Sequence, residues 1–271
     1  MITALTGPKG REGASLAQEP RDGRGRPYHV RLSKKDVGRI AFLPGDPGRV
    51  PRIAERFQDA GELTSNREYS AYGGWIGGEK VVAVSTGIGG PAAAIAIEEL
   101  ARLGVEIMIR VGTCGAIAQD IRLGSVIIAD SAVRMDGTSV QYVPLGYPAA
   151  ATPGVVMALE EAARSLGKRA SVGITASTDS FYVGQGRKSF GGYLPSGSAH
   201  IVEDLRAVNV LCFEMEAATL FTLGRVFGLK TGALFAVVAN RATNEFKPEA
   251  GVENAIDVAV ESVRLLKKFS V

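Results

Sequence analysis

Cysteine, histidine and long hydrophobic runs are scarce in this sequence of 271 residues. Its two cysteines, Cys114 and Cys212, are too few for a disulfide framework, and they lack the spacing of metal ligands. Two histidines make a zinc site unexpected. Apolar runs such as Ala233–Ala239 are far shorter than a membrane span, and no secretory signal opens the chain. These absences predict a soluble, cytoplasmic protein with no metal and no membrane partner.

The balance of charge argues against a nucleic-acid-binding protein. The sequence has 31 basic and 28 acidic residues, and the small basic excess lies in residues 1–31. A nucleic-acid-binding protein usually carries clustered Lys and Arg on its folded domain. We therefore expect no nucleic-acid partner.

The chain divides into an arm and one domain. Residues 1–27 combine glycine, proline and scattered charge without hydrophobic periodicity, which predicts a flexible N-terminal arm. From Tyr28 onward the pattern stays globular, without internal repeats or a linker. The sequence is 46% hydrophobic, enough for a large core, so we expect a single α/β domain over residues 28–271.

Short apolar runs alternate with segments of helical periodicity along this domain. This alternation predicts a central mixed, mostly parallel twisted sheet flanked by helices on both faces. The expected strands are Ile40–Pro44, Lys80–Ser85, Glu106–Val111, Ser125–Asp130, Ala170–Ala176, Cys212–Met215 and Ala233–Ala239, and the expected helices are Val50–Phe57, Pro91–Leu103, Gly154–Leu166, Ala217–Phe227 and Val252–Leu266.

Polar and glycine-rich segments follow several of these strands, where ligands bind in open α/β folds. Glycine allows backbone N–H groups to approach an anion, and arginine offers a planar fork for phosphate oxygens. The coincidence of Gly45, Arg49, Arg110 and Thr113 at two strand ends predicts a site for phosphate or a phosphorylated ligand. No Walker-type GxxxxGKS/T motif and no GxGxxG after a strand occurs, which disfavours nucleoside triphosphates and dinucleotides.

Six strings of residues together resemble the nucleoside phosphorylase-I family, and the last three resemble its uridine-cleaving members. The similarity runs from about Tyr28 to Lys268. The strings are Pro44–Val50, Ser85–Pro91, Arg110–Gly115, Asp179–Arg187, Phe213–Ala217 and Asn240–Thr243.

The resemblance implies a pentosyltransferase of pyrimidine salvage that cleaves uridine reversibly with inorganic phosphate, giving uracil and ribose 1-phosphate. Deoxyuridine and thymidine remain open as substrates. Phosphate would be bound by Gly45, Arg49, Arg110 and Thr113, joined by Arg67 from a neighbouring subunit. Inorganic phosphate is then a substrate, and no cofactor is required.

The resemblance also assigns residues to the ribose. Glu216 would bind the 2′- and 3′-hydroxyls, because an ionised carboxylate only accepts hydrogen bonds. Met215 would pack against the sugar, and His29 would reach the 5′-hydroxyl across a subunit boundary. Glu214 is left between two roles, a second sugar contact and a structural partner of a nearby arginine.

Gln185 and Arg187 carry the prediction of a pyrimidine base. A glutamine amide both donates and accepts, which suits N3–H and O2 of uracil, whereas Arg187 only donates, which suits O4. Phe181 would lie against the ring. Arg241 stands where purine-specific relatives have an aspartic acid. Arg110, Arg187 and Arg241 are the expected catalytic residues, placed to stabilise developing negative charge.

Members of the family can hold potassium at a dimer interface through a glutamate, a backbone carbonyl and a serine. Glu68 and Ile88 match the first two ligands, but Ala92 replaces the serine, which argues against this ion. Sites shared between chains imply a homo-oligomer, and the resemblance implies a hexamer.

Three alternatives remain at this stage. They are a purine nucleoside phosphorylase of the same fold, a hydrolase that uses water in place of phosphate, and a catalytically silent nucleoside-binding protein. The three candidate phosphate arginines argue against the hydrolase, which has no anion to hold.

Overall fold

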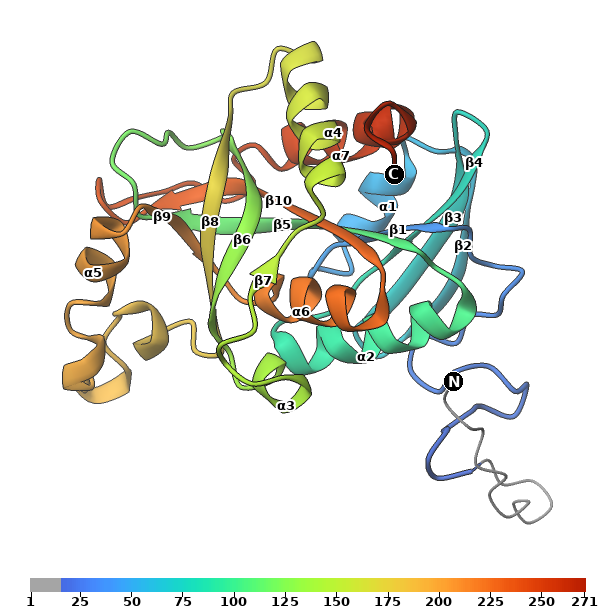
Figure 1. Ribbon diagram of the computed structural model, residues 1–271, viewed down its shortest axis with the longest axis horizontal. Coiled ribbons are helices and arrows are strands. Elements are labelled where there is room, and N and C mark those ends of the chain that lie inside the picture. Colours follow the sequence, from blue (N-terminus) through green and yellow to red (C-terminus); the bar gives the residue numbers. More distant parts are fainter. Residues whose placement is uncertain (1–15) are drawn as a thin grey trace.

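A twisted mixed sheet runs through the computed structural model, which describes residues 16–271 (Figure 1). Within this part of the chain the strand order is β11-β10-β6-β8-β9-β5-β1-β4-β3-β2, and β7 pairs with β6. The strands are β1 (Ile40–Leu43), β2 (Gln58–Asn66), β3 (Tyr69–Ile76), β4 (Glu79–Val84), β5 (Ile107–Ala116), β6 (Val126–Met135), β7 (Ala149–Ala150), β8 (Ala170–Thr178), β9 (Val210–Glu214), β10 (Lys230–Asn240) and β11 (Glu245–Phe246).

The central part of the sheet closes into a ring. β10 pairs with both β5 and β6, and β6, β8, β9 and β5 pair in that order. The two longest pairings, β5 with β10 and β6 with β8, are parallel, whereas β9 is antiparallel to β5. The mixed α/β fold is confirmed, but the sequence pattern did not indicate that the sheet closes.

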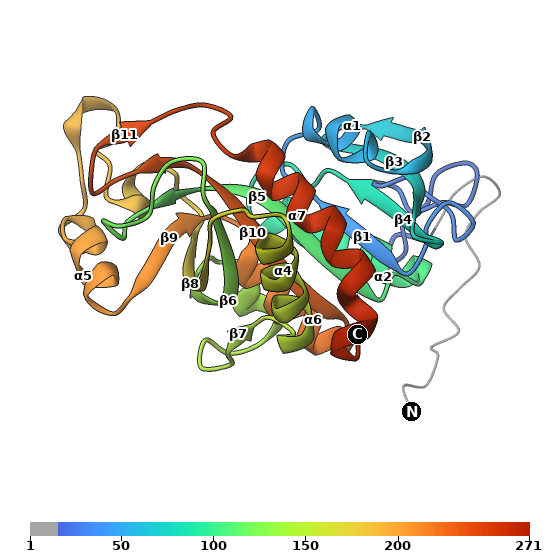
Figure 2. The ribbon, with the colours of Figure 1, turned by 90° about the horizontal axis from the view of Figure 1, so that it is seen from above.

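Helices cover both sides of the sheet. In Figures 1 and 2, α4 and α7 lie together on one side, and α2 and α6 lie together on the other. None of the helices described between residues 16 and 271 is both long and apolar enough to cross a membrane. Their bounds are α1 (Arg49–Ala54), α2 (Gly90–Leu103), α3 (Ser139–Tyr142), α4 (Pro153–Ser165), α5 (Ile201–Ala207), α6 (Ala217–Phe227) and α7 (Val252–Leu265).

Two buried apolar clusters hold these layers together. Ile97 of α2 and Phe221 of α6 belong to one cluster, and Leu159 of α4 and Ile256 of α7 belong to the other. All four side chains are fully buried. The predicted helices over α2, α4, α6 and α7 are confirmed, while α1 begins at Arg49 and ends at Ala54, earlier than the predicted Val50–Phe57.

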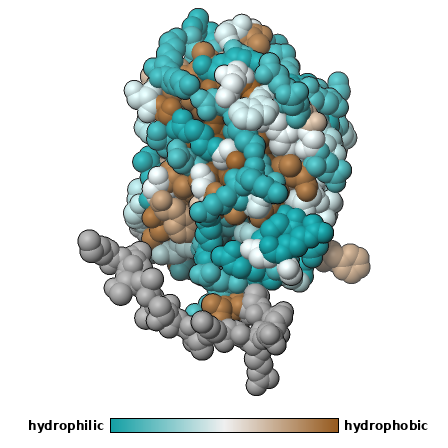
Figure 3. All heavy atoms as spheres, turned by 90° about the vertical axis from the view of Figure 1, so that its right-hand side faces the viewer, coloured by the Kyte–Doolittle hydropathy of each residue, from teal (hydrophilic) through white to brown (hydrophobic). Residues whose placement is uncertain are grey.

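The hairpin of β2 and β3 was missed from the sequence. β2 is mostly exposed, so it lacks the apolar alternation of a half-buried strand. In β3, Gly74 interrupts the pattern because a Cβ there would lie 2.7 Å from Cβ of Phe57. Figure 3 faces the side of the molecule that carries this hairpin, and hydrophilic residues predominate on it.

Residues 16–27 include a turn that is closed by its own hydrogen bonds. Asp22 accepts from Nε of Arg26 at 2.8 Å and from the N–H of Arg24 at 2.9 Å, and the N–H of Tyr28 donates to the carbonyl of Pro20 at 3.2 Å. Residues 1–15 lie outside the described part of the chain. A flexible arm that ends at residue 27 stays a prediction.

Candidate active site

A pocket of about 600 Å³ lies where several strands end. The turn after β1, the turn after β4, the second half of β5, the loop after β8 and the end of β9 all contribute to its wall. The pocket therefore lies where the sequence predicts ligand binding, beyond the carboxyl ends of strands. Of the predicted site residues, those that line it are Gly45, Arg49, Arg110, Thr113, Phe181, Gln185, Arg187, Met215 and Glu216.

Two buried arginines define one end of the pocket. Arg49 and Arg110 are 7% and 6% exposed, and Nη1 of Arg49 donates to the carbonyl of Val111 at 3.1 Å. Nε of each arginine has no hydrogen-bond partner among the described residues. Burial, followed by the charge of Arg110, lowers the pKa of Arg49. Two like charges with unused N–H groups in a buried wall form a site suited to an anion.

Glycine leaves room beside these arginines. A Cβ at Gly45 would lie 3.1 Å from the carbonyl oxygen of Gly87 and 3.4 Å from Nη2 of Arg110. A larger residue at this position would therefore press on the turn after β4. Thr113, on the same strand as Arg110, adds a hydroxyl to this end of the pocket.

Glu216 forms the next part of the wall and is 3% exposed. Its Oε1 accepts from the N–H of Gly89 at 2.6 Å, and its Oε2 accepts from Nη2 of Arg110. Gly89 has a φ of +92°, a conformation that favours glycine. A buried carboxylate with remaining acceptor capacity can bind paired hydroxyl groups.

Glu214 also lines the pocket and is buried. Burial, followed by the negative charge of Glu216, raises the pKa of Glu214 to about 7. The sequence left the role of this residue open, and in the structure its Oε2 lies 4.0 Å from Nε of Arg110.

Gln185 and Arg187 lie at the other end of the pocket. Gln185 is 4% exposed, its Nε2 donates to Oγ1 of Thr178 at 3.2 Å, and its Oε1 accepts from Nη1 of Arg187 at 2.6 Å. The guanidinium of Arg187 lies 4.1 Å from the centre of the Phe181 ring. Burial, followed by the charge of Arg241, lowers the pKa of Arg187 to about 10.

Arg241 does not line the pocket but supports it. Its Nη1 donates to the backbone carbonyl of Gln185 at 2.8 Å, so it fixes the loop that carries Gln185 and Arg187. Phe246 of β11 also lines the pocket, and the sequence missed it because β11 is a two-residue strand among polar residues, with no apolar pattern around it.

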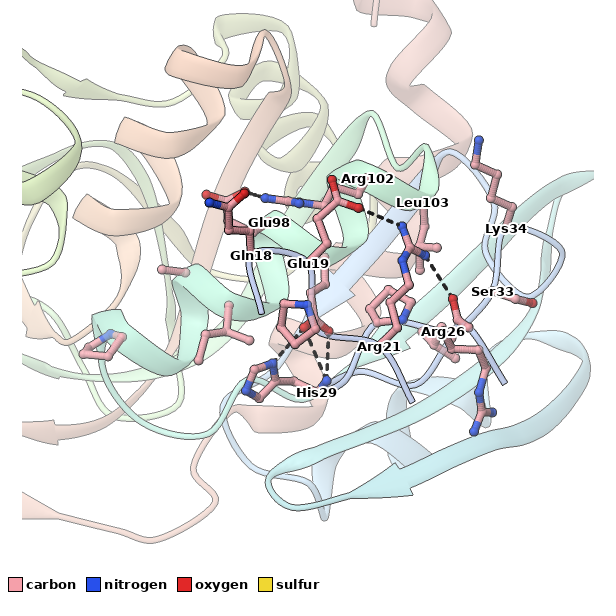
Figure 4. Close-up of a pocket in the computed structure, with 18 of the residues that line it drawn as sticks. Gln18, Glu19, Arg21, Arg26, His29, Ser33, Lys34, Glu98, Arg102 and Leu103 are labelled. Atoms are coloured by element: carbon pink, nitrogen blue, oxygen red, sulfur yellow. Dashed lines mark hydrogen bonds and ion pairs between the residues drawn. The ribbon is translucent and has the colours of Figure 1, made fainter. Parts of the chain in front are cut away.

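His29 and Arg67 are not brought to this pocket within one chain. Nδ1 of His29 pairs with Oε1 of Glu99 at 2.7 Å, and both residues line a second cavity of about 730 Å³ beside α2, where Figure 4 shows His29 below Glu98 and Arg102. Arg67 lies in the turn between β2 and β3, with its guanidinium 5.7 Å from the centre of the Tyr28 ring.

The potassium ligands of the family are only partly matched in this chain, because Ala92, at the position of the serine, has no side-chain oxygen. Between residues 16 and 271, no group of three or more His, Cys, Asp or Glu side chains is arranged to hold a metal.

The chain is similar to known proteins over most of its length. The family model described as the phosphorylase superfamily matches residues 39–270. The chain is similar to a uridine phosphorylase of Thermococcus kodakarensis, with 51% identity over 93% of this chain and 91% of the relative. It is also similar to a uridine phosphorylase of Haemophilus influenzae, at 40% identity over 87% and 95%, and to a guanosine phosphorylase of Halorubrum lacusprofundi, at 37% identity over 88% and 98%.

The two buried arginines predict that inorganic phosphate stabilises the folded protein. Ligand at 100 times its Kd adds about 2.7 kcal/mol to the free energy of unfolding. We expect phosphate to raise the Tm of the wild type and to have little effect on Arg49→Ala, measured by thermal unfolding. Arg52→Ala is the matched control, because Arg52 lies on the same helix but pairs with Glu249 and Glu253 outside the pocket. Equal phosphate-induced shifts in the two variants would contradict an anion site at Arg49.

Proposed function

Because the chain belongs to the phosphorylase superfamily, we propose that it cleaves uridine with inorganic phosphate, giving uracil and ribose 1-phosphate. It is then a pentosyltransferase, and the reaction is reversible. The observation that carries this function is one pocket with an anion site at Arg49 and Arg110, an acceptor at Glu216 and an amide-guanidinium pair at Gln185 and Arg187.

The positions of these groups along the pocket determine where phosphate, ribose and base would lie. Phosphate lies between Arg49 and Arg110 with the hydroxyl of Thr113, beneath C1′ of the ribose. Glu216 accepts hydrogen bonds from the 2′- and 3′-hydroxyls, and Met215 packs on the sugar. Holding the two reactants in line removes much of the entropic part of the barrier.

As the bond to C1′ breaks, negative charge gathers on the base. Arg187 donates to O4 of uracil and stabilises this charge. Gln185 uses its amide for N3–H and O2, so base binding replaces the hydrogen bond between its Oε1 and Arg187. Arg241 acts through the loop, because it donates to the carbonyl of Gln185. Phe181, half-exposed at the mouth, offers its ring to the base.

A purine substrate is the second candidate, since one relative at 37% identity is named guanosine phosphorylase. Against it stands Arg241, a permanent cation that cannot protonate a purine as it leaves. Uridine is therefore the better substrate for this pocket.

The proposal includes a cytoplasmic homo-oligomer, a hexamer by resemblance. His29 and Arg67 lie outside the pocket of their own chain, which supports their contribution to the site of a neighbour. The nucleoside and phosphate are its other partners.

The test of the reaction is dependence on phosphate. We expect uracil release from uridine, followed by absorbance, to require added phosphate, and Arg110→Ala to abolish turnover or raise the KM for phosphate. Rates that are equal with and without phosphate would show a hydrolase instead.

Arg187 should determine the choice of base. Removing one donor to developing charge typically lowers the rate by about 10²–10³, so we expect Arg187→Ala to lower kcat/KM for uridine by this factor. Lys188→Ala, a change of the exposed neighbouring cation, should leave it unchanged. Cytidine places an amino donor against Arg187, and a wild-type preference for uridine on the order of 10⁴ is expected. Efficient cleavage of cytidine or inosine would refute the assignment of the base site.

Sharing of sites predicts complementation between inactive subunits. Arg67→Ala and Arg110→Ala change different halves of a shared site, so a mixed oligomer contains some sites with neither change. We expect the mixture to regain activity once its subunits have exchanged. Subunit exchange can be verified by the mass of the mixed oligomer. If activity does not return after that, each chain forms its own site.

A further inference from the structure

Glu214 lies where the start of α6, Ser177 of β8 and Arg110 of β5 come together. It is the last residue of β9, and its side chain is 1% exposed. Its Oε2 accepts from the N–H groups of Glu216 and Ala217, both at 2.8 Å, and its Oε1 accepts from the hydroxyl of Ser177. The two N–H donors lie at the start of α6, where backbone N–H groups have no partner inside the helix, and Ser177 lies on β8.

Ser177 extends the same arrangement. Its Oγ accepts from the N–H of Ala218 at 2.8 Å while its hydroxyl donates to Glu214. Three successive backbone N–H groups are thus held by one carboxylate and one hydroxyl. The backbone of Glu216 is fixed at this point, and with it the direction of the carboxylate that meets Gly89 and Arg110.

The guanidinium of Arg110 lies between the two carboxylates. Its Nη2 donates to Glu216, and its Nε lies 4.0 Å from Oε2 of Glu214 without a hydrogen-bond partner among the described residues. The charged and titratable groups that act on Glu214 are Arg110 and Cys114 on β5 and Glu216 beside it in the chain, and β8 contributes only the hydroxyl of Ser177. When both glutamates are ionised, two negative charges share one arginine.

We propose that Glu214 is a positioning residue that holds Glu216 and Arg110 in place and takes up a proton from solvent when phosphate binds. The inference rests on the proposed function, because it assumes phosphate at Arg49 and Arg110. Phosphate brings further negative charge to Arg110, and repulsion then favours neutral Glu214. The neutral carboxyl retains its hydrogen bonds when the Ser177 hydroxyl rotates: its carbonyl oxygen still accepts from the two N–H groups, and its own hydroxyl donates to Oγ of Ser177, whose hydrogen turns away from Glu214.

Replacing Glu214 with glutamine removes the negative charge of the side chain but keeps its size and its hydrogen-bonding groups. Glu214→Gln retains an acceptor for the two N–H groups and a donor for Ser177, but it is neutral at every pH. The pKa of Glu214 is raised to about 7 by burial and by Glu216, so Glu214 in the free wild type is neutral below this value and ionised above it. Phosphate binding to the wild type therefore requires proton uptake only above this pKa, where Glu214 is ionised in the free protein.

The experiment is calorimetric titration of the full-length protein with inorganic phosphate, without nucleoside. The titration of phosphate itself is the same for both proteins, so the ratio of their Kd values cancels it. An upward shift of one unit in the pKa of Glu214 on binding corresponds to about a tenfold change in affinity. We expect the ratio of wild-type to Glu214→Gln Kd to rise about tenfold between about pH 6 and about pH 8.5. Glu160→Gln, on the exposed face of α4, is the control and should follow the wild type.

Ser177→Ala provides a second, independent variant. The hydrogen bond from Ser177 lowers the pKa of Glu214, so its loss should move the alkaline fall in phosphate affinity to higher pH. A constant Kd ratio between wild type and Glu214→Gln, or an unmoved midpoint in Ser177→Ala, would overturn the proposal. If the wild type binds phosphate with this pH dependence but does not cleave uridine, the proposed function fails and the inference stands. If the wild type binds no phosphate, both fail.

Discussion

The burial of one positive charge, the guanidinium of Arg110, is the constraint on which the site depends. A buried charge is strongly destabilising unless it is paired and hydrogen-bonded. Arg110 reaches Thr86 through Nη1 at 3.4 Å, Glu216 through Nη2, and lies 4.0 Å from Glu214. These partners come from the turn after β4 and from the end of β9, so the charge can be accommodated only when the sheet has brought both segments to β5.

The closed ring of strands explains how this happens. β9 runs antiparallel to β5, with Gly115 opposite Phe213, which places Glu214 beside the strand that carries Arg110. α6 begins directly after Glu216, and Glu214 and Ser177 accept from the N–H groups of Glu216, Ala217 and Ala218 at its start. The same contacts that begin a core helix therefore orient the carboxylate proposed to bind ribose. Structure and chemistry are coupled at this point, because the same carboxylate accepts from the first N–H groups of α6 and lies 4.0 Å from Arg110.

How far the sequence predicts this arrangement depends on how local each feature is. Gly45 and Arg49 lie within one turn and helix start, and Arg110 and Thr113 lie on one strand, so their grouping could be predicted. Placing Glu214 against Arg110 required the antiparallel pairing of β9 with β5, which joins residues about a hundred positions apart, and no local pattern encodes it. The hairpin of β2 and β3 escaped prediction because exposure and Gly74 remove its apolar alternation. His29 and Arg67 could be named by resemblance, but within a single chain both lie outside the pocket. That they contribute to the site of a neighbouring subunit stays a prediction.

In the proposed reaction, phosphate held by Arg49 and Arg110 attacks C1′ directly. The most direct measurement is to cleave uridine with phosphate whose oxygens are isotopically labelled, in unlabelled water, and to examine the ribose product by mass spectrometry. We expect ribose 1-phosphate in which the oxygen that bridges C1′ and phosphorus carries the label. Free ribose carrying unlabelled oxygen from water at C1′ would contradict it.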